Sequence, residues 1–394
     1  MKGLRSFFVI TILLAAALFS GCAKAGAPAA QQPIKIGGGF DLSGSMSSLD
    51  LPMSQGAKLA VKEINAAGGV LGRPLALVIR DSKYDQVLTA QITQQYINED
   101  KVVAMLGFSD SDEVLIAGPA IQKAGLIFIT PGATSPKLPA QIGDKAFLAA
   151  FGDNVQAAAG AEFGFKKFGK SAYLLWDADT EYTTGLARYF NARFTELGGT
   201  VVLADTYPGQ ATDFSAQISK LKALPKQPDF YYVAAMPEHV GPLAKQFRAA
   251  GITGPIVGGD GYDTPDLIGI GGPAADNVYF STHALMDANS GTDRIKKFMA
   301  AYKAEYGHEP ENAFAALGYD GVYLLADAIR RAGSTDANAI KAALEGTKNF
   351  LGITGSVTFS ADSHVPRKAV TIIAVRNSKF ALSEELVPEK VPAP

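Results

Sequence analysis

Apolar and polar residues alternate along the chain in a pattern typical of short strands followed by helices. In the first part, apolar segments rich in β-branched and aromatic residues are separated by stretches with helical spacing. The predicted strands are residues 34–40, 75–80, 102–106 and 126–130, and the predicted helices are residues 51–67, 85–98 and one that opens after residue 109. This order predicts a parallel sheet with right-handed crossovers.

A second series of the same kind follows residue 151. Its predicted strands are residues 171–176, 200–204, 229–234 and 255–257, and its predicted helices are residues 155–168, 185–197, 213–224 and 238–250. A helix, two glycines and a strand follow one another at residues 65–78 and again at 196–203. We therefore predict an α/β protein with two doubly wound lobes of one architecture.

The last third of the chain has too few strand–helix units for a third sheet. We expect its elements to complete the two lobes, so that the chain crosses between them several times and forms a hinge. Lobe 1 is then predicted as residues 34–152 plus 281–356, and lobe 2 as residues 153–280 plus 357–386. The Pro-rich tail, residues 387–394, is expected to be disordered.

The N-terminal 22 residues have the pattern of an export signal. Basic residues precede an apolar run at residues 7–19, which is short for a membrane span, and small residues follow it. Residues 20–22, Ser-Gly-Cys, resemble a bacterial lipobox, although Phe19 stands where leucine is usual. We expect a lipoprotein signal peptide that ends at a lipidated Cys22, with simple cleavage nearby as the alternative. Residues 23–33 are predicted to be a flexible tether, and the protein to be exported and membrane-anchored by its lipid.

Composition and motifs exclude several function classes. The only cysteine is Cys22, so the exported part has no disulfide and no thiolate metal site. The net charge of −2 gives no basic footprint for nucleic acid. The 4 histidines are scattered, and neither a nucleophile elbow nor a phosphate-binding P-loop is present. We therefore expect that the protein is not an enzyme and holds no cofactor and no metal. We also expect it to be a monomer.

Residues 102–135 contain the clearest indication of a ligand-binding site in the sequence. Two predicted strands each end in a short loop of small and hydroxyl residues, at 107–111 and 131–135, and the first loop opens a helix. In a parallel sheet these loops lie at the carboxyl ends of neighbouring strands, where open α/β folds bind ligands. Helix N–H groups and hydroxyls suit an anion such as a carboxylate.

Three carboxylates in the same stretch allow another interpretation. Asp110, Asp112 and Glu113 could form a catalytic carboxylate cluster. Acids in the first turn of a helix, with Ser109 as its N-cap, explain them more simply. The sequence leaves open whether Asp110 and Asp112 face the helix or a cleft.

Short motifs spread along the chain resemble one known family. They include LSG at 42–44, INAAGG at 64–69, ITPGATSP at 129–136, GGDG at 258–261, GYD at 318–320 and GITG at 352–355. In this order, residues 34 to about 382 resemble the periplasmic binding proteins of the leucine/isoleucine/valine type, the receptors of branched-chain amino-acid ABC importers. The resemblance implies the type I fold, with a multi-strand hinge and a ligand cleft between the lobes.

The resemblance also implies which lobe 1 residues hold the head group of an amino acid. Ser111 falls where the family uses a serine to bind the ligand carboxylate. Gly132, Ala133 and Thr134 fall on the second loop, whose backbone groups and hydroxyl grip the head group.

The remaining ligand contacts are implied on both lobes. Asp260 falls on an acid that pairs with the ligand ammonium, and Tyr182 on an aromatic that closes over the ligand. Leu49, Met236 and Phe314 fall on the walls of the side-chain pocket, with Met236 where an aromatic is often found. From spacing alone, Tyr182 in a predicted loop and Phe314 at a helix start fit the core slightly better than a binding site.

Taken together, these features predict an extracytoplasmic receptor that binds a small, branched-chain or similar aliphatic amino acid and delivers it to an ABC importer permease. An aromatic carboxylate or an amide is the alternative ligand, because Met236, Asp110 and Asp112 depart from the family pattern. An enzyme that uses the carboxylates of residues 110–113 is the alternative of another class, and it lacks a general base or nucleophile motif.

Overall fold

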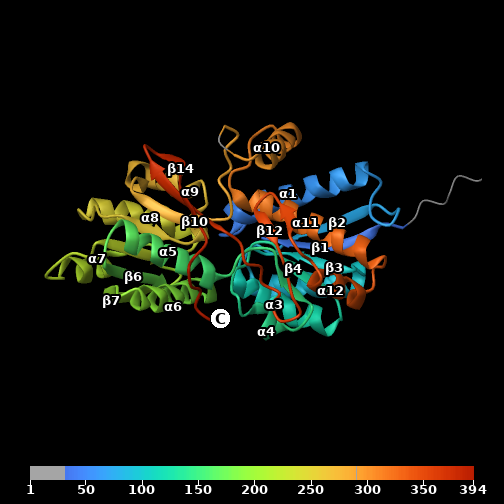
Figure 1. Cartoon of the computed structure of the whole chain (residues 1–394), viewed down its shortest axis with the longest axis horizontal. Coiled ribbons are helices and arrows are strands. Elements are labelled where there is room, and N and C mark those ends of the chain that lie inside the picture. Colours follow the sequence, from blue (N-terminus) through green and yellow to red (C-terminus); the bar gives the residue numbers. More distant parts are fainter. Residues whose placement is uncertain (1–31, 290) are drawn as a thin grey trace, which may run out of the picture. The chain divides into compact units, whose positions relative to one another are not determined.

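Two large sheets organise the computed structural model, which describes residues 32–289 and 291–394 (Figure 1). The first has parallel strands in the order β2-β1-β3-β4-β5. They are β1 (Ile34–Phe40), β2 (Leu75–Asp81), β3 (Ala104–Gly107), β4 (Ile127–Thr130) and β5 (Ala146–Leu148). The strand order changes direction between β1 and β3, and open α/β sheets bind ligands outside the carboxyl ends of strands at such a point.

The second sheet has the order β14-β13-β10-β9-β8-β6-β7. Its strands are β6 (Ser171–Asp177), β7 (Thr200–Tyr207), β8 (Phe230–Ala234), β9 (Ile256–Gly258), β10 (Val278–Thr282), β13 (Val370–Arg376) and β14 (Lys379–Leu386). The strands from β6 to β10 pair in parallel, whereas β13 pairs antiparallel with both β10 and β14. A small hairpin, β11 (Phe350–Gly352) and β12 (Gly355–Val357), stands apart from both large sheets.

The helices divide between the two sheets. With the first belong α1 (Ser47–Ala66), α2 (Gln86–Gln95), α3 (Ser111–Lys123), α4 (Leu138–Ile142), α10 (Asp293–Tyr306), α11 (Ala313–Ala332) and α12 (Ala337–Glu345). With the second belong α5 (Asp153–Lys167), α6 (Glu181–Glu196), α7 (Ser215–Lys222), α8 (Pro237–Ala249) and α9 (Asp266–Gly271). The predicted α/β architecture with two doubly wound lobes is therefore confirmed.

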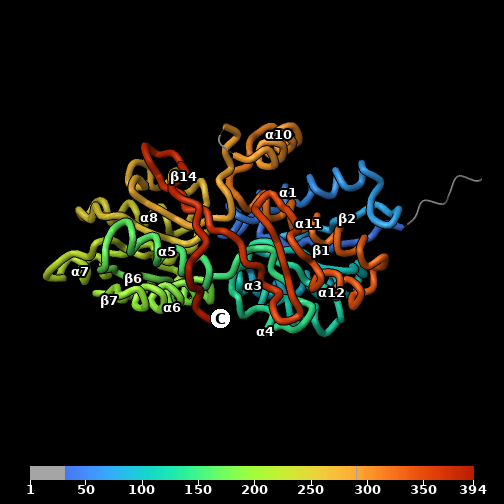
Figure 2. The backbone as a smooth tube through the Cα atoms, in the orientation of Figure 1, coloured from blue at the N-terminus to red at the C-terminus, as the bar shows by residue number. Residues whose placement is uncertain are grey.

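The chain passes between the sheets at several places, which can be followed in Figure 2. It does so from β5 to α5, from β10 to α10 and from β12 to β13. Lys368 joins the last of these crossings to the first, because its Nζ donates to Ala149 O at 3.2 Å; it also donates to Thr354 Oγ1, in the turn between β11 and β12, at 2.6 Å. The lobe boundaries, residues 34–152 plus 281–356 for lobe 1 and residues 153–280 plus 357–386 for lobe 2, remain a prediction.

Two glycines explain why α1 and α11 can pack so closely. A Cβ at Gly56 would lie 1.8 Å from Ala315 O, and one at Gly318 would lie 2.0 Å from Met53 O. Only glycine leaves room for such an approach of two backbones. The close packing of these helices places Phe314, at the start of α11, and Leu49 of α1 on the wall of the same cavity.

Two predicted helix starts are wrong, because each helix begins earlier than its apolar pattern indicates. α1 begins at Ser47 rather than at residue 51, and Asp41 Oδ2 accepts the N–H of Met46, the residue before it, at 2.7 Å. α6 begins at Glu181, since Thr180 Oγ1 accepts the Thr183 N–H at 3.2 Å. Tyr182 therefore lies in the first turn of a helix and not in a loop.

The C-terminal tail was expected to be disordered, and the structure corrects this. The Glu389 N–H donates to Glu162 Oε2 of α5 at 3.0 Å, and Asn154 Nδ2 donates to Pro392 O at 2.9 Å. Backbone groups that hydrogen-bond to a helix are held in place.

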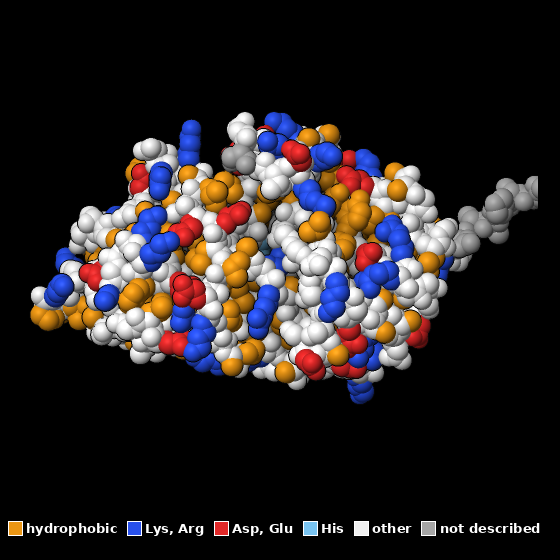
Figure 3. Space-filling model, viewed as in Figure 1, with side chains coloured by type: hydrophobic (Ala, Val, Ile, Leu, Met, Phe, Trp, Pro, Cys, Tyr) orange, Lys and Arg blue, Asp and Glu red, His pale blue; other side chains and the backbone are white. Residues whose placement is uncertain are grey.

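On the face drawn in Figure 3, Lys and Arg side chains are interspersed with Asp and Glu. Within residues 32–289 and 291–394, no helix combines the length and the apolar character needed to cross a membrane. The predicted signal peptide, Cys22 and almost all of the tether lie outside the described residues.

Candidate functional site

Most of the predicted ligand-binding residues line one cavity, with an empty volume of about 260 Å³. The elements of the first sheet contribute Leu49, Gly132, Thr134 and Phe314, and those of the second contribute Tyr182, Met236 and Asp260. Residues far apart in the sequence therefore meet where the two lobes face each other. We call this space the ligand cavity.

The loop after β4 is held rigidly at this cavity. Thr130 Oγ1 donates to Phe108 O at 2.9 Å and accepts the Ala133 N–H at 3.0 Å. A Cβ at Gly132 would lie 3.0 Å from Ser109 Cα, so the two loops that follow β3 and β4 touch here. Backbone groups of this loop are thereby positioned for a ligand.

Two predicted residues, Ser111 and Ala133, do not line the ligand cavity. Ser111 is 1% exposed, and its Oγ accepts the Ser135 N–H at 3.2 Å. Ala133 is fully buried. Ser109 and Asp110 line the cavity in place of Ser111. The loop geometry thus turns the residues before Ser111, rather than Ser111 itself, toward the cavity.

Asp260 is the centre of a buried hydrogen-bond network. Its Oδ1 accepts from Tyr182 OH at 2.9 Å and from Gln156 Nε2 at 2.8 Å, and its Oδ2 lies 3.0 Å from His283 Nε2. The Tyr182 hydroxyl in turn accepts the Gly261 N–H at 2.8 Å. Both carboxylate oxygens are thus held in fixed positions at the wall of the cavity.

Sequence reasoning missed Gln156 and His283. The scattered histidines gave no sign of a role in a site, but His283 is 3% exposed and stacks on Phe151 with ring centroids 3.9 Å apart. Burial lowers the pKa of His283, so the neutral ring donates from Nε2 to Asp260. No sequence spacing signals these partners, since each comes from a different element.

Asp110 answers the question that the sequence left open, because it serves both the helix and the cavity. Its Oδ1 accepts the N–H groups of Asp112 at 2.9 Å and Glu113 at 3.2 Å, so Asp110, and not Ser109, is the N-cap of α3. Its side chain also lines the ligand cavity. Burial, reinforced by the charge of Asp112, raises the pKa of Asp110 to about 7.

Asp112 connects the two lobes at the edge of the site. Its Oδ2 accepts the Glu181 N–H at the start of α6 at 3.2 Å. Beside it, Lys137 Nζ pairs with Glu181 Oε1 at 3.1 Å. These contacts join α3 and the segment before α4 to α6.

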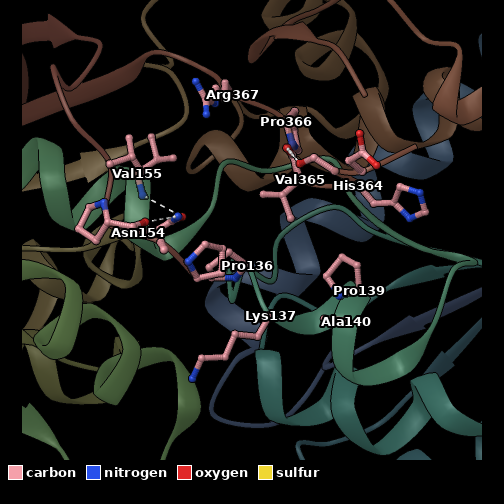
Figure 4. Close-up of a pocket in the computed structure, with 16 residues that line it drawn as sticks. Pro136, Lys137, Pro139, Ala140, Asn154, Val155, His364, Val365, Pro366 and Arg367 are labelled. Carbon is pink, nitrogen blue, oxygen red and sulfur yellow. Dashed lines mark hydrogen bonds between the residues drawn. The ribbon is translucent and has the colours of Figure 1, made fainter. Parts of the chain in front are cut away.

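A larger cavity, with an empty volume of about 1150 Å³, lies elsewhere (Figure 4). It is lined by residues 136, 137, 139, 140, 154–155, 362–367 and 391–394, among them several prolines. None of the predicted ligand-binding residues lines it, so its size alone does not make it the functional site.

Comparison with known proteins agrees with this geometry. Residues 33–379 match a family model described as "Periplasmic binding protein". The chain is 27% identical over 348 residues to Leu/Ile/Val-binding protein homolog 1 of Brucella suis, which covers 87% of this chain and 91% of that protein.

Two solved structures are similar in both sequence and fold. One is the branched-chain amino acid transporter substrate-binding protein LivJ of Streptococcus pneumoniae in complex with isoleucine, with 33% identity, a TM-score of 0.83 and coverage of 90% of this chain and 100% of that one. The other is the leucine-binding protein LivK of Thermotoga maritima, with 31% identity, a TM-score of 0.83 and coverage of 90% and 99%.

Proposed function

Since the chain belongs to the periplasmic binding protein family, with the type I fold of the branched-chain amino-acid transporters, we propose that it binds a small amino acid in the ligand cavity and delivers it to the permease of an ABC importer. Family membership makes it an extracytoplasmic solute-binding protein, in a family whose members bind and do not convert their solutes.

The arrangement of Asp260 opposite the β4 loop carries this proposal. Asp260 is 2% exposed and lines the cavity, so an ammonium group that enters finds a fixed carboxylate there. Across the cavity, the hydroxyls of Ser109 and Thr134 lie on the wall, and each can turn from a neighbouring carboxylate, Asp50 or Asp153, to donate to the ligand carboxylate. An α-amino acid satisfies both sides at once. A ligand that bridges the lobes stabilises their closed arrangement by differential affinity.

Leu49, Phe314 and Met236 supply the apolar wall beside this head-group site. An aromatic carboxylate, the alternative that the sequence left open, lacks an ammonium for Asp260. Such a ligand would leave a buried carboxylate without a counterion and would bring a second anion next to it. We therefore propose an amino acid as the ligand.

Isothermal titration calorimetry with a panel of L-amino acids, aromatic carboxylates and amides tests the function. We expect saturable binding of at least one amino acid and none of benzoate. Binding of a carboxylate without an amino group, together with no response to any amino acid, would overturn the proposal.

We also propose that Cys22 carries the lipid anchor and that the receptor works as a monomer. Export of the full chain and of Cys22→Ser, followed by detergent partitioning, tests the anchor. Partitioning of both forms into the aqueous phase would contradict it.

A further inference from the structure

A second cavity adjoins the ligand cavity, with an empty volume of about 1100 Å³. Asp110 and Met236 line both, so these two side chains form the partition between them. Elements of both lobes enclose the second cavity: the loop before α2, the start of α3, the loop before α6 and the start of α8.

The ionisable groups of this second cavity are almost all acidic. No Lys, Arg or His lines it, and Tyr84 is the only other ionisable group among its described lining residues. Its carboxylates are Asp110, Asp112, Glu113, Asp177, Asp179 and Glu238. We call it the acidic chamber.

A buried oxygen without a partner points from this cluster to a ligand. Asp110 is 2% exposed, and its Oδ2 has no hydrogen-bond partner among the described residues, while Oδ1 is used by the α3 cap. Glu113 Oε2 and Glu238 Oε2 are also buried and unpartnered. A buried carboxylate oxygen without a donor is costly, and a cation at this place would relieve the cost.

The raised pKa values of the acids in the chamber agree with the absence of a neighbouring positive charge among its described lining residues. Besides burial, the charges of neighbouring acids raise the pKa of Asp110 to about 7 and that of Glu113 to about 9. Burial, together with the charge of Asp177, also raises the pKa of Glu238. The nearest histidine, His239, lies 3.8 Å from Asp177 Oδ2, and burial lowers its pKa, so it supplies little charge.

We propose that the solute has a second cation, an ammonium or guanidinium at the end of an aliphatic stem, which lies in the acidic chamber. This inference rests on the proposed function, because it places the amino-acid head group at Asp260 and Thr134. The stem would cross the partition against Leu49 and Met236, in the way that long cationic side chains bury their methylenes. The ring of Tyr84, which lines the chamber, offers a further surface to an organic cation.

An organic cation fits better than a metal ion. In the part of the chain that the structure describes, no group of three or more His, Cys, Asp or Glu side chains is arranged to hold a metal. Metal sites need oxygens that converge at short, regular distances, whereas an alkylammonium tolerates acids spread around a chamber.

The test compares L-lysine with L-norleucine, which differ only by the terminal ammonium. Calorimetry on the full exported chain at pH 8 should show lysine or arginine binding at least tenfold more tightly than norleucine and leucine. The double variant Asp110→Asn/Glu238→Gln should abolish that preference, while asparagine still caps α3. Glu238→Gln alone, whose side chain lines the acidic chamber and not the ligand cavity, should weaken the preference and leave norleucine affinity within about twofold. Glu309→Gln, an exposed acid paired with Lys303, changes the net charge by the same one unit as Glu238→Gln and should preserve the preference.

Each outcome separates this inference from the proposed function. Tighter binding of leucine or norleucine than of lysine would overturn the second cation and leave the amino-acid receptor standing. Absence of binding by every amino acid would overturn the proposed function itself. Saturable binding of CaCl₂ alone that is lost in the double variant would overturn the organic cation in favour of a metal.

Discussion

Asp260 and Asp110 line the same cavity, yet their carboxylates differ in the hydrogen-bond partners that surround them. Both oxygens of Asp260 have side-chain partners from three elements, whereas Asp110 uses one oxygen for a helix cap and leaves the other without a partner. A carboxylate whose two oxygens both have hydrogen-bond partners is held in one position, which suits the head group that all α-amino acids share. A carboxylate with one unpartnered oxygen can bind a further cationic group elsewhere on the ligand.

Replacing Asp260 should have the largest effect. Asp260→Asn keeps the shape of the side chain but removes the charge that faces the ligand ammonium. We expect affinity for the best amino acid to fall by about tenfold to a hundredfold, because a charge-assisted hydrogen bond contributes roughly 1.5–3 kcal/mol. Calorimetry measures this, and thermal unfolding of the variant checks that it folds. Unchanged affinity would remove Asp260 from the head-group site.

The pH dependence of binding should distinguish Asp110 from Asp260. The pKa of Asp110 is raised to about 7 and a cation favours its ionised form, so affinity for lysine should increase with pH. Between pH 6 and 8 the ionised fraction of such a group changes about tenfold, which sets the expected rise. The groups that face it are Asp112, Glu113, Glu238, Asp177, Asp179 and Tyr84, with His239 beyond Asp177.

Norleucine should show a much flatter profile, and Asp110→Asn should flatten the lysine profile. A lysine affinity that stays constant between pH 6 and 8 in the parent protein would contradict the role of Asp110.

His283 should have a smaller effect, since it acts on the ligand only through Asp260. His283→Gln keeps a donor near Asp260 Oδ2, and His283→Ala removes it. We expect His283→Ala to weaken amino-acid binding about two- to tenfold, as for the loss of one hydrogen bond, and His283→Gln to recover part of that loss. Equal losses in both variants would indicate that only the packing of the ring on Phe151 matters.

The smallest effect should be on the stability of the ligand-free protein. The folded pKa of Asp110 lies above its unfolded value, so its contribution to stability is fully present below about pH 4 and is lost as the pH rises through about 7. Asp110→Asn cannot ionise and still caps α3, so it should unfold at a higher temperature than the parent at pH 8 and at a similar one at pH 4. A lower melting temperature at pH 8 would contradict this sign.

The alternation of strands and helices was enough to predict the fold class, because hydrophobic periodicity and the glycines that end helices are local properties of the chain. Thus β1 and β3 lie within two residues of the predicted ranges, and Phe314 starts a helix as expected. Helix starts were less accurate, since Asp110 caps α3 and Thr180 caps α6 from positions that pattern alone does not identify.

Family motifs found the two loops of the site and most of the residues that line the cavity, but they pointed to Ser111 in place of Ser109 and Asp110. Ser111 was expected to hold the ligand, and the backbone at the start of α3 turns Ser109 and Asp110 there instead. Gln156 and His283 could not be found, because they are 104 and 23 residues away from Asp260, on other elements.

The sequence by itself determined the α/β class, the order of the elements and the two loops at the strand ends, since each depends on neighbouring residues and on backbone preferences. Only the tertiary structure decided which oxygen of Asp110 has a partner, that His283 supports Asp260, and that acids from α3, α8 and the loop before α6 share one chamber. The physical reason is that burial and charge interaction depend on distance in space, and two lobes that meet across a cavity bring together residues that no sequence interval relates.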